Sequence, residues 1–148
     1  MSYANDMTTT VDPQLASQLR IAVMRLSRRL RRERADDSLT ASQVSALATI
    51  DRYGPVSLGE LASLEYVQPP SMTRIVTSLE QMLLVRRAPH VSDGRQVILE
   101  TTAPGQRLLA SDRERRDAWL CHRIRDLSAE ERQTLHKASG IIERLAQS

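Results

Sequence analysis

Stretches whose apolar residues recur every three or four positions alternate with short polar breaks along most of the chain. Such spacing places apolar side chains on one face of an α-helix, and it first predicts a long helix from Asp12-Pro13 to a break at residues 36–38. Later helices are expected to open at capping boxes, in which Ser or Thr stands three residues before Glu or Gln. These boxes begin at Thr40, Ser57 and Ser128. The pattern indicates a mainly helical protein.

Residues 68–80 form the most informative of these helices because its two faces differ. Pro69 and Pro70 suit a first helical turn, where no intrahelical N–H is needed. The apolar face is expected to hold Met72, Ile75, Val76, Leu79 and Leu83. The other face carries small or polar residues and no carboxylate: Pro70, Ser71, Arg74, Thr77, Ser78 and Gln81. Arginine can bond guanine O6 and N7, and hydroxyls can bond bases or phosphates, so this face could lie in the major groove of DNA. The alternative is the solvated face of an ordinary amphipathic helix.

The segments on either side of this helix favour the DNA interpretation. The short helix that opens at Ser57 and a turn of three or four residues precede it, which is the helix-turn-helix arrangement. Two β-rich segments, 84–89 and 96–101, follow it and are joined by Ser92–Arg95, in which Asp-Gly is expected to supply the positive φ of a tight turn. Together these elements predict a winged helix, and a short strand is also possible at Pro55-Val56.

The predicted hairpin carries three arginines, which are Arg86, Arg87 and Arg95. Arg95 lies at its tip, and an arginine on a thin loop can enter the minor groove, where the potential is most negative. Asp93 could orient Arg95 or a neighbouring arginine through a charge-assisted bond. The alternative is a surface β-ribbon with ordinary charges.

The first and last predicted helices carry apolar stripes that a compact winged helix does not need. Thr101 or Thr102 is expected to cap the long helix that precedes the last one. The simplest way to bury the stripes is against each other and against a second chain. The residues expected at this dimer interface are Leu15, Leu19, Leu135, Ile142 and Leu145. A two-fold dimer would place two recognition helices about one DNA turn, ~34 Å, apart.

Composition changes this picture little. The 148 residues are 41% hydrophobic and only 3% aromatic, so the core must be aliphatic. A net charge of +3 is weak evidence for an anionic partner. Of 21 basic residues only Lys137 is lysine, which suits phosphate binding but would follow equally from a bias toward arginine codons.

The sequence carries no recognisable catalytic or metal-binding pattern. The single cysteine, Cys121, excludes an internal disulfide, and the three histidines are scattered, so neither a metal site nor a cofactor is expected. No nucleophile–base pair or phosphate-binding loop is visible, which argues against an enzyme. The first ten residues lack the apolar segment of a signal peptide, and no apolar run is long enough to cross a membrane, so we expect a cytoplasmic protein.

Taken together, these motifs resemble the MarR-type (multiple antibiotic resistance regulator) family of transcriptional regulators. The resemblance rests on the order and spacing of several short pieces over residues 39–131. They are Leu39-Thr40-x-x-Gln43, Tyr53-Gly54-Pro55, Leu58-Gly59-Glu60-Leu61-Ala62, Val67 to Glu80, Leu84-Val85-Arg86-Arg87, Ser92-Asp93-Gly94-Arg95, Thr101-Thr102-x-x-Gly105 and Leu127-Ser128-x-Glu130-Glu131. One departure is Leu83, which stands where the family commonly has glycine. A second is the wing tip, where Gly94 and Gln96 flank a single arginine.

The resemblance implies a homodimer of winged-helix protomers that binds a pseudo-palindromic operator in double-stranded DNA. Family members usually repress transcription, and many leave DNA when a small phenolic or carboxylate effector binds between the dimerisation helices and the winged helix. Carried onto this sequence, Pro70, Ser71, Thr73 and Arg74 would face the major groove, and Arg95 would be the wing arginine. A winged helix that binds proteins, or DNA with little sequence preference, is the alternative.

These inferences combine into one organisation for the chain. We expect a mainly α protein with a small β-hairpin, in which a winged helix-turn-helix domain is flanked by dimerisation helices. The expected parts are a disordered tail at 1–11, an N-terminal dimerisation helix at 12–38, the DNA-binding domain at 39–101 and C-terminal dimerisation helices at 102–148.

Overall fold

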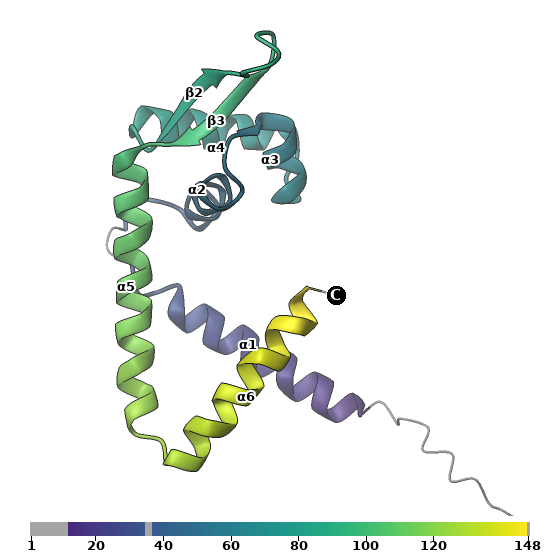
Figure 1. The fold of residues 1–148 in the computed structure, drawn as a ribbon, viewed down its shortest axis with the longest axis vertical. Coiled ribbons are helices and arrows are strands. Elements are labelled where there is room, and N and C mark those ends of the chain that lie inside the picture. Colours follow the sequence, from purple (N-terminus) through teal and green to yellow (C-terminus); the bar gives the residue numbers. More distant parts are fainter. Residues whose placement is uncertain (1–11, 35–36, 148) are drawn as a thin grey trace, which may run out of the picture. The chain divides into compact units, whose positions relative to one another are not determined.

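The computed structural model describes residues 12–34 and 37–147, and it confirms a mainly helical chain with a β-hairpin (Figure 1). The tail predicted at residues 1–11 lies outside the described residues. The elements in chain order are α1 (Pro13–Leu30), α2 (Ala41–Tyr53), β1 (Val56–Ser57), α3 (Leu58–Leu64), α4 (Pro69–Gln81), β2 (Val85–Pro89), β3 (Val97–Thr101), α5 (Ala103–Arg125) and α6 (Ala129–Ala146). The chain divides into two compact units, one that contains α1 and one from residue 34 onward.

The predicted caps account for where the helices begin. The Asp12 carboxylate accepts hydrogen bonds from the backbone N–H groups of Gln14 and Leu15 at the start of α1. The three capping boxes are complete, because in each the hydroxyl and the Gln or Glu side chain bond reciprocally to backbone N–H groups. Of the two threonines considered for α5, Thr102 is the cap, since its hydroxyl accepts from the Gly105 N–H at 3.2 Å.

Helix α1 is shorter than predicted. It ends at Leu30, although the sequence suggested that it would continue to the break at residues 36–38. The residues that follow Leu30 are mainly charged and include Arg31, Arg32 and Arg34. Like charges three or four positions apart destabilise a helix, and no apolar residue in this segment extends the stripe.

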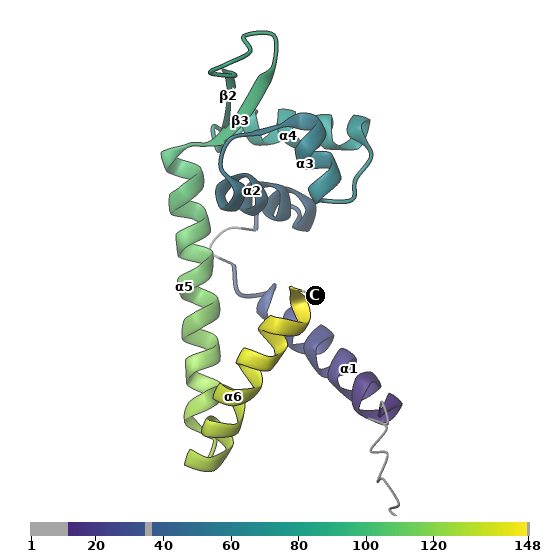
Figure 2. The same ribbon diagram turned by 45° about the vertical axis from the view of Figure 1, so that its right-hand side comes forward.

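Three strands form the sheet, in the order β1-β3-β2, with antiparallel pairing throughout. The short strand expected near Pro55-Val56 is β1, in which Val56 pairs with Leu99. Strands β2 and β3 form the predicted hairpin, with Arg86 opposite Glu100. The hairpin extends away from the helices, and α4 and α3 lie near its base (Figure 2).

The apolar core lies within residues 39–109 and joins α2, α3, α4, the sheet and the start of α5. From α4, Met72, Val76 and Leu79 are fully buried, and Ile75 packs against them. The core is aliphatic, as the composition predicted, and it fixes which face of α4 is turned outward. No helix in the described part of the chain is both long and apolar enough to span a membrane.

The prediction that Leu83 lies on the buried face of α4 is wrong. Helix α4 ends at Gln81, and Leu83 is 71% exposed with a φ of 61°. The N–H of Leu83 bonds to the Glu80 carbonyl and the N–H of Leu84 bonds to the Leu79 carbonyl, which is the Schellman arrangement. Leu83 therefore occupies the left-handed position that favours glycine, and its side chain is turned away from the core.

Candidate DNA-binding surface

The turn between α3 and α4 is fixed to α2 by a carboxylate. Glu65, the residue after α3, accepts a 2.7 Å hydrogen bond from the Ser45 hydroxyl and another from the Thr49 hydroxyl. The next residue, Tyr66, has a φ of 54° and directs the chain into α4. The sequence does not reveal these contacts, because the partners of Glu65 lie 16 and 20 residues away and no local pattern links them. These two bonds hold the turn that precedes α4 against α2.

Helix α4 presents most of its predicted polar face to solvent. Pro70, Ser71, Thr73, Arg74 and Thr77 are exposed. Two of the hydroxyls also bond within the helix, where Thr73 donates to the Pro69 carbonyl at 2.9 Å and Thr77 donates to the Thr73 carbonyl at 2.8 Å. Their oxygens can still accept bonds from outside, so they would act toward DNA mainly as acceptors.

Ser78 differs from the other residues of this face. It is half-buried, and its hydroxyl accepts a 2.8 Å hydrogen bond from the Gln43 side-chain amide on α2. Gln43 is also the acceptor of the α2 capping box. This serine therefore braces α4 against α2, and the remaining polar face lies nearer the N-terminal end of α4.

The four arginines predicted to act on DNA fall into two pairs. At the wing base, Arg86 is bonded to Glu100 across the hairpin at 2.6 Å, and Arg87 is paired with Glu80 at the end of α4. In residues 12–34 and 37–147, the guanidinium groups of Arg74 and Arg95 have no hydrogen bond or ion pair, and both are exposed. Of these four charges, the one on α4 and the one at the wing tip are therefore available to an outside partner.

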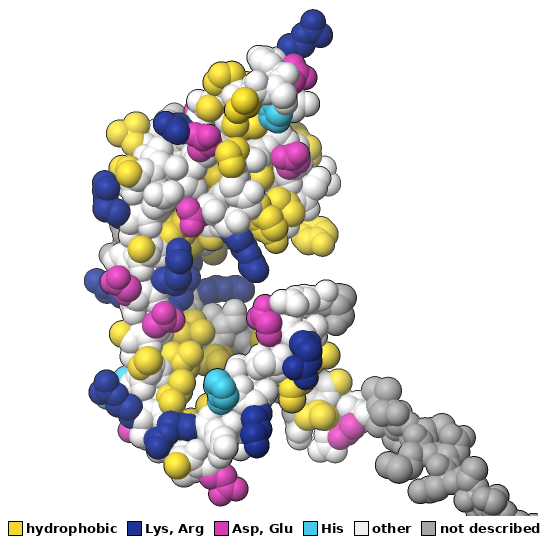
Figure 3. All heavy atoms as spheres, viewed as in Figure 1, with side chains coloured by type: hydrophobic (Ala, Val, Ile, Leu, Met, Phe, Trp, Pro, Cys, Tyr) yellow, Lys and Arg dark blue, Asp and Glu magenta, His cyan; other side chains and the backbone are white. Residues whose placement is uncertain are grey.

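The wing tip is a seven-residue loop with defined geometry. Its ends are joined by the His90 N–H, which donates to the Gln96 carbonyl at 2.9 Å. The Gln96 N–H donates to the Asp93 carbonyl at 3.0 Å, so Asp93 begins a turn in which Arg95 is the third residue. The Asp93 carboxylate accepts from the Arg95 backbone N–H at 3.1 Å, so it orients the backbone of this arginine. A basic side chain stands at the tip of the hairpin, with an acidic side chain just below it (Figure 3).

The prediction that Gly94 supplies a positive φ is wrong. Among the described glycines a positive φ occurs at Gly54 and not at Gly94. The prediction assumed a tight two-residue hairpin turn, which needs left-handed residues. The longer loop instead places Asp93 first in its turn, where aspartate is favoured and glycine is not required.

The residues predicted at a dimer interface are largely exposed in the single chain. Leu15 and Leu145 are each 59% exposed, Leu135 is 48% and Ile142 is 38%, while Leu19 is half-buried. Neither α1 nor α6 contributes a buried residue. Their apolar stripes are therefore available for contacts that a lone chain does not make.

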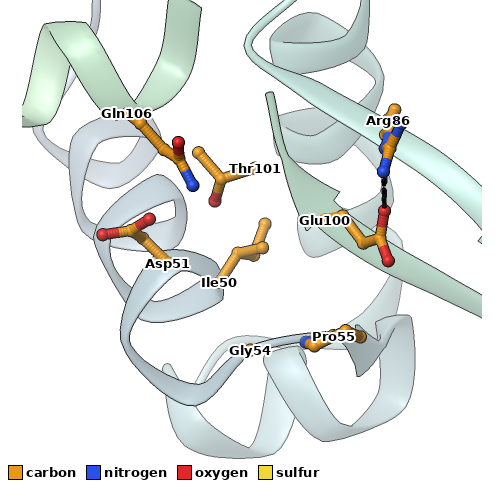
Figure 4. Close-up of a pocket in the computed structure, with 8 residues that line it drawn as sticks. All are labelled: Ile50, Asp51, Gly54, Pro55, Arg86, Glu100, Thr101 and Gln106. Carbon is orange, nitrogen blue, oxygen red and sulfur yellow. Dashed lines mark hydrogen bonds and ion pairs between the residues drawn. The ribbon is translucent and has the colours of Figure 1, made fainter. Parts of the chain in front are cut away.

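Two other features bear on chemistry. A cavity of about 270 Å³ lies where α2, the wing base and α5 meet, and Figure 4 shows its lining. Asp51 and Gln106 line it together with the paired Arg86 and Glu100, so it is polar and carries two carboxylates. Among the described residues no cluster of side chains could hold a metal ion, and Cys121 is an exposed free thiol.

Comparison with known proteins places this fold and surface in a family. Residues 39–97 match the model of the MarR family. The chain is 44% identical to the uncharacterised HTH-type transcriptional regulator Mb0904 of Mycobacterium bovis over 88% of this chain and 92% of the relative. It is 32% identical to the HTH-type transcriptional repressor NicR of Pseudomonas putida over 67% of this chain and 63% of the relative.

A solved structure shows the same architecture. The crystal structure of a proposed transcriptional regulator from Pseudomonas aeruginosa is 35% identical, covers 94% of this chain and 99% of its own, and superposes with a TM-score of 0.82. The agreement extends well beyond the segment matched by the family model. On these grounds the chain belongs to the MarR family of transcriptional regulators.

Proposed function

We propose that the protein is a sequence-specific, operator-binding repressor that acts as a homodimer. The observation that carries this proposal is the pair of exposed, unpaired guanidinium groups, Arg74 on α4 and Arg95 at the wing tip. Arg74 stands among Ser71 and Thr73 on a face without a competing carboxylate. Such a face suits the major groove, and Arg95 suits the adjacent minor groove.

The homodimer is supported by the apolar stripes of α1 and α6, which hold no buried residue in the single chain. The unit that contains the winged helix has its own core within residues 39–109. Residues 12–38 and 102–148, most of which lie outside this core, are proposed to serve mainly as dimerisation segments. A two-fold axis between protomers would present two copies of α4 to half-sites about 34 Å apart. Sedimentation tests this step, and a monomer at micromolar concentration would contradict it.

The DNA-reading role is tested by binding to sites selected from random sequence. Arg74→Ala should weaken the selected site by about 1–3 kcal/mol and relax its preference at the guanine that Arg74 contacts. Arg74→Lys is the matched control, because lysine retains the charge but cannot form the bidentate contact. It should keep binding to unrelated DNA and lose discrimination.

A different outcome would support a low-specificity DNA binder or a protein-binding winged helix. If Arg74→Ala and Arg95→Ala bind the selected site like the unmodified protein at physiological salt, neither arginine reads DNA. If selection returns no palindrome, the two-fold operator is rejected.

Repression and its release by a small aromatic or carboxylate ligand complete the proposal. The repressor NicR supports the direction of control, since this chain is 32% identical to it. The cavity at the wing base suits an anion poorly because Asp51 and Glu100 line it, so we expect the ligand site to be completed by the second protomer. Titration of small aromatic acids against the DNA complex tests this step, and failure of all of them to release DNA would contradict ligand control.

A further inference from the structure

The side chain of His90 is placed at the centre of the wing-tip loop. Its Nδ1 accepts hydrogen bonds from the backbone N–H groups of Ser92 at 3.2 Å and Asp93 at 3.3 Å. The Ser92 hydroxyl lies 2.9 Å from the same nitrogen. His90 is half-buried, whereas the five residues that follow it are exposed. One ring nitrogen thus contacts three polar groups in the first half of an otherwise exposed loop.

These contacts reach Arg95 through Asp93. The N–H of Asp93 is held by His90, while the carboxylate and carbonyl of Asp93 hold the N–H groups of Arg95 and Gln96. The His90 N–H also closes the loop on the Gln96 carbonyl. The backbone around Arg95 therefore rests on an acceptor three residues before the turn. Without that acceptor, two N–H groups lose their partner and the loop gains alternative conformations.

We propose that His90 is the positioning residue of the wing, which holds Arg95 in the orientation that enters the minor groove. The inference rests on the proposed contact between Arg95 and DNA. An acceptor at Nδ1 requires a neutral ring with its proton on Nε2. A side chain should therefore replace His90 in this role only if its hydrogen-bond acceptor is attached to Cγ.

Asparagine and glutamine separate this role from general effects of the substitution. The Oδ1 of asparagine is attached to Cγ, as Nδ1 is, so His90→Asn keeps the acceptor where Ser92 and Asp93 need it. The Oε1 of glutamine lies one bond further along the side chain, so His90→Gln is a polar control without that geometry. His90→Ala removes the acceptor altogether.

The experiment measures affinity for the selected operator in the full chain. Arg95→Ala should weaken binding about tenfold, in the range of a lost charged hydrogen bond. His90→Ala and His90→Gln should each weaken it about threefold or more, while His90→Asn stays within about twofold. Because His90 acts through Arg95, His90→Ala should have no further effect in the Arg95→Ala background. Side-chain ¹⁵N spectra should show the His90 proton on Nε2.

The outcomes distinguish the inference from the function on which it rests. If Arg95→Ala binds like the unmodified protein, the wing contact fails and the positioning role fails with it. If Arg95→Ala weakens binding but His90→Ala does not, only the inference is overturned. It is also overturned if His90→Asn binds as poorly as His90→Ala, or if His90→Ala weakens binding equally in the Arg95→Ala background.

Discussion

Helices α4 and α6 both carry an apolar stripe, but the stripes differ in what covers them. Met72, Val76 and Leu79 of α4 are fully buried, whereas Leu135 and Leu145 of α6 are 48% and 59% exposed. The partners of α4 are α2, α3 and strand β2, which lie close to it in sequence. Helix α6 itself contributes no buried residue. The periodicity of a stripe predicts a helix, while the surface that covers it depends on the rest of the assembly.

The sharpest test of this difference compares two leucine truncations. Leu79→Ala should lower the free energy of unfolding by about 2–5 kcal/mol, because it opens a cavity in a fully buried site. Leu145→Ala should leave the unfolding of the winged helix nearly unchanged. Its effect should depend on protein concentration if α6 is covered by a second protomer. Denaturant unfolding at two protein concentrations measures both. An effect of Leu79→Ala that varied with concentration would contradict the proposed separation of core and interface.

The next test places a charge on the α6 stripe. Ile142→Glu should weaken self-association by about 3 kcal/mol, or roughly 100-fold in Kd, because it buries an unpaired carboxylate at the proposed interface. The circular dichroism spectrum of the variant should keep its helical signal, since Ile142 is not part of the core. Gln133→Glu is the matched control, because it adds the same charge at an exposed position on the opposite face of α6. Sedimentation equilibrium measures the association, and equal behaviour of the two variants would reject this face as the interface.

The features of the fold that the sequence predicted are those determined by neighbouring residues. Caps and stripes are local, so Asp12, the three capping boxes and the buried face of α4 were predictable. The end of α4 was not, because apolar spacing alone places Leu83 on the buried face. The end is determined by backbone bonds from Leu83 and Leu84 back into the helix, and by the Thr102 hydroxyl, which donates to the Leu83 carbonyl at 2.6 Å from 19 residues away.

The same distinction applies to the candidate site. The residue types on α4 were visible in the sequence, and so was the arginine at the wing tip. Which of these groups are available to DNA depends on contacts between different elements, which residue types alone do not show: Gln43 of α2 bonds Ser78 of α4, and Glu80 of α4 pairs with Arg87 of β2. The part played by His90 was hidden for a different reason. Its bonds are local, but histidine carries no strong turn preference and the Asp-Gly pair drew attention to a tighter turn.

The smallest expected effect concerns the helix ends inside the winged helix. Tyr66 and Leu83 both occupy the left-handed position after a helix, with φ of 54° and 61°, and both side chains are exposed. Left-handed backbone costs a non-glycine residue about 1–2 kcal/mol. Glycine removes this strain, but it also gives the unfolded chain more conformational entropy, which offsets part of the gain. Leu83→Gly and Tyr66→Gly should therefore each stabilise the winged helix by about 0.5–1 kcal/mol, without changing self-association.

Alanine at the same positions separates backbone strain from side-chain exposure. Leu83→Ala and Tyr66→Ala remove the exposed side chains but keep a Cβ in the left-handed region, so neither should stabilise the protein as glycine does. Denaturant midpoints of the four variants, measured in parallel, provide the comparison. Equal gains from alanine and glycine would show that removal of an exposed apolar side chain is the cause. A loss with glycine alone would show that unfolded-state entropy outweighs the strain at these helix ends.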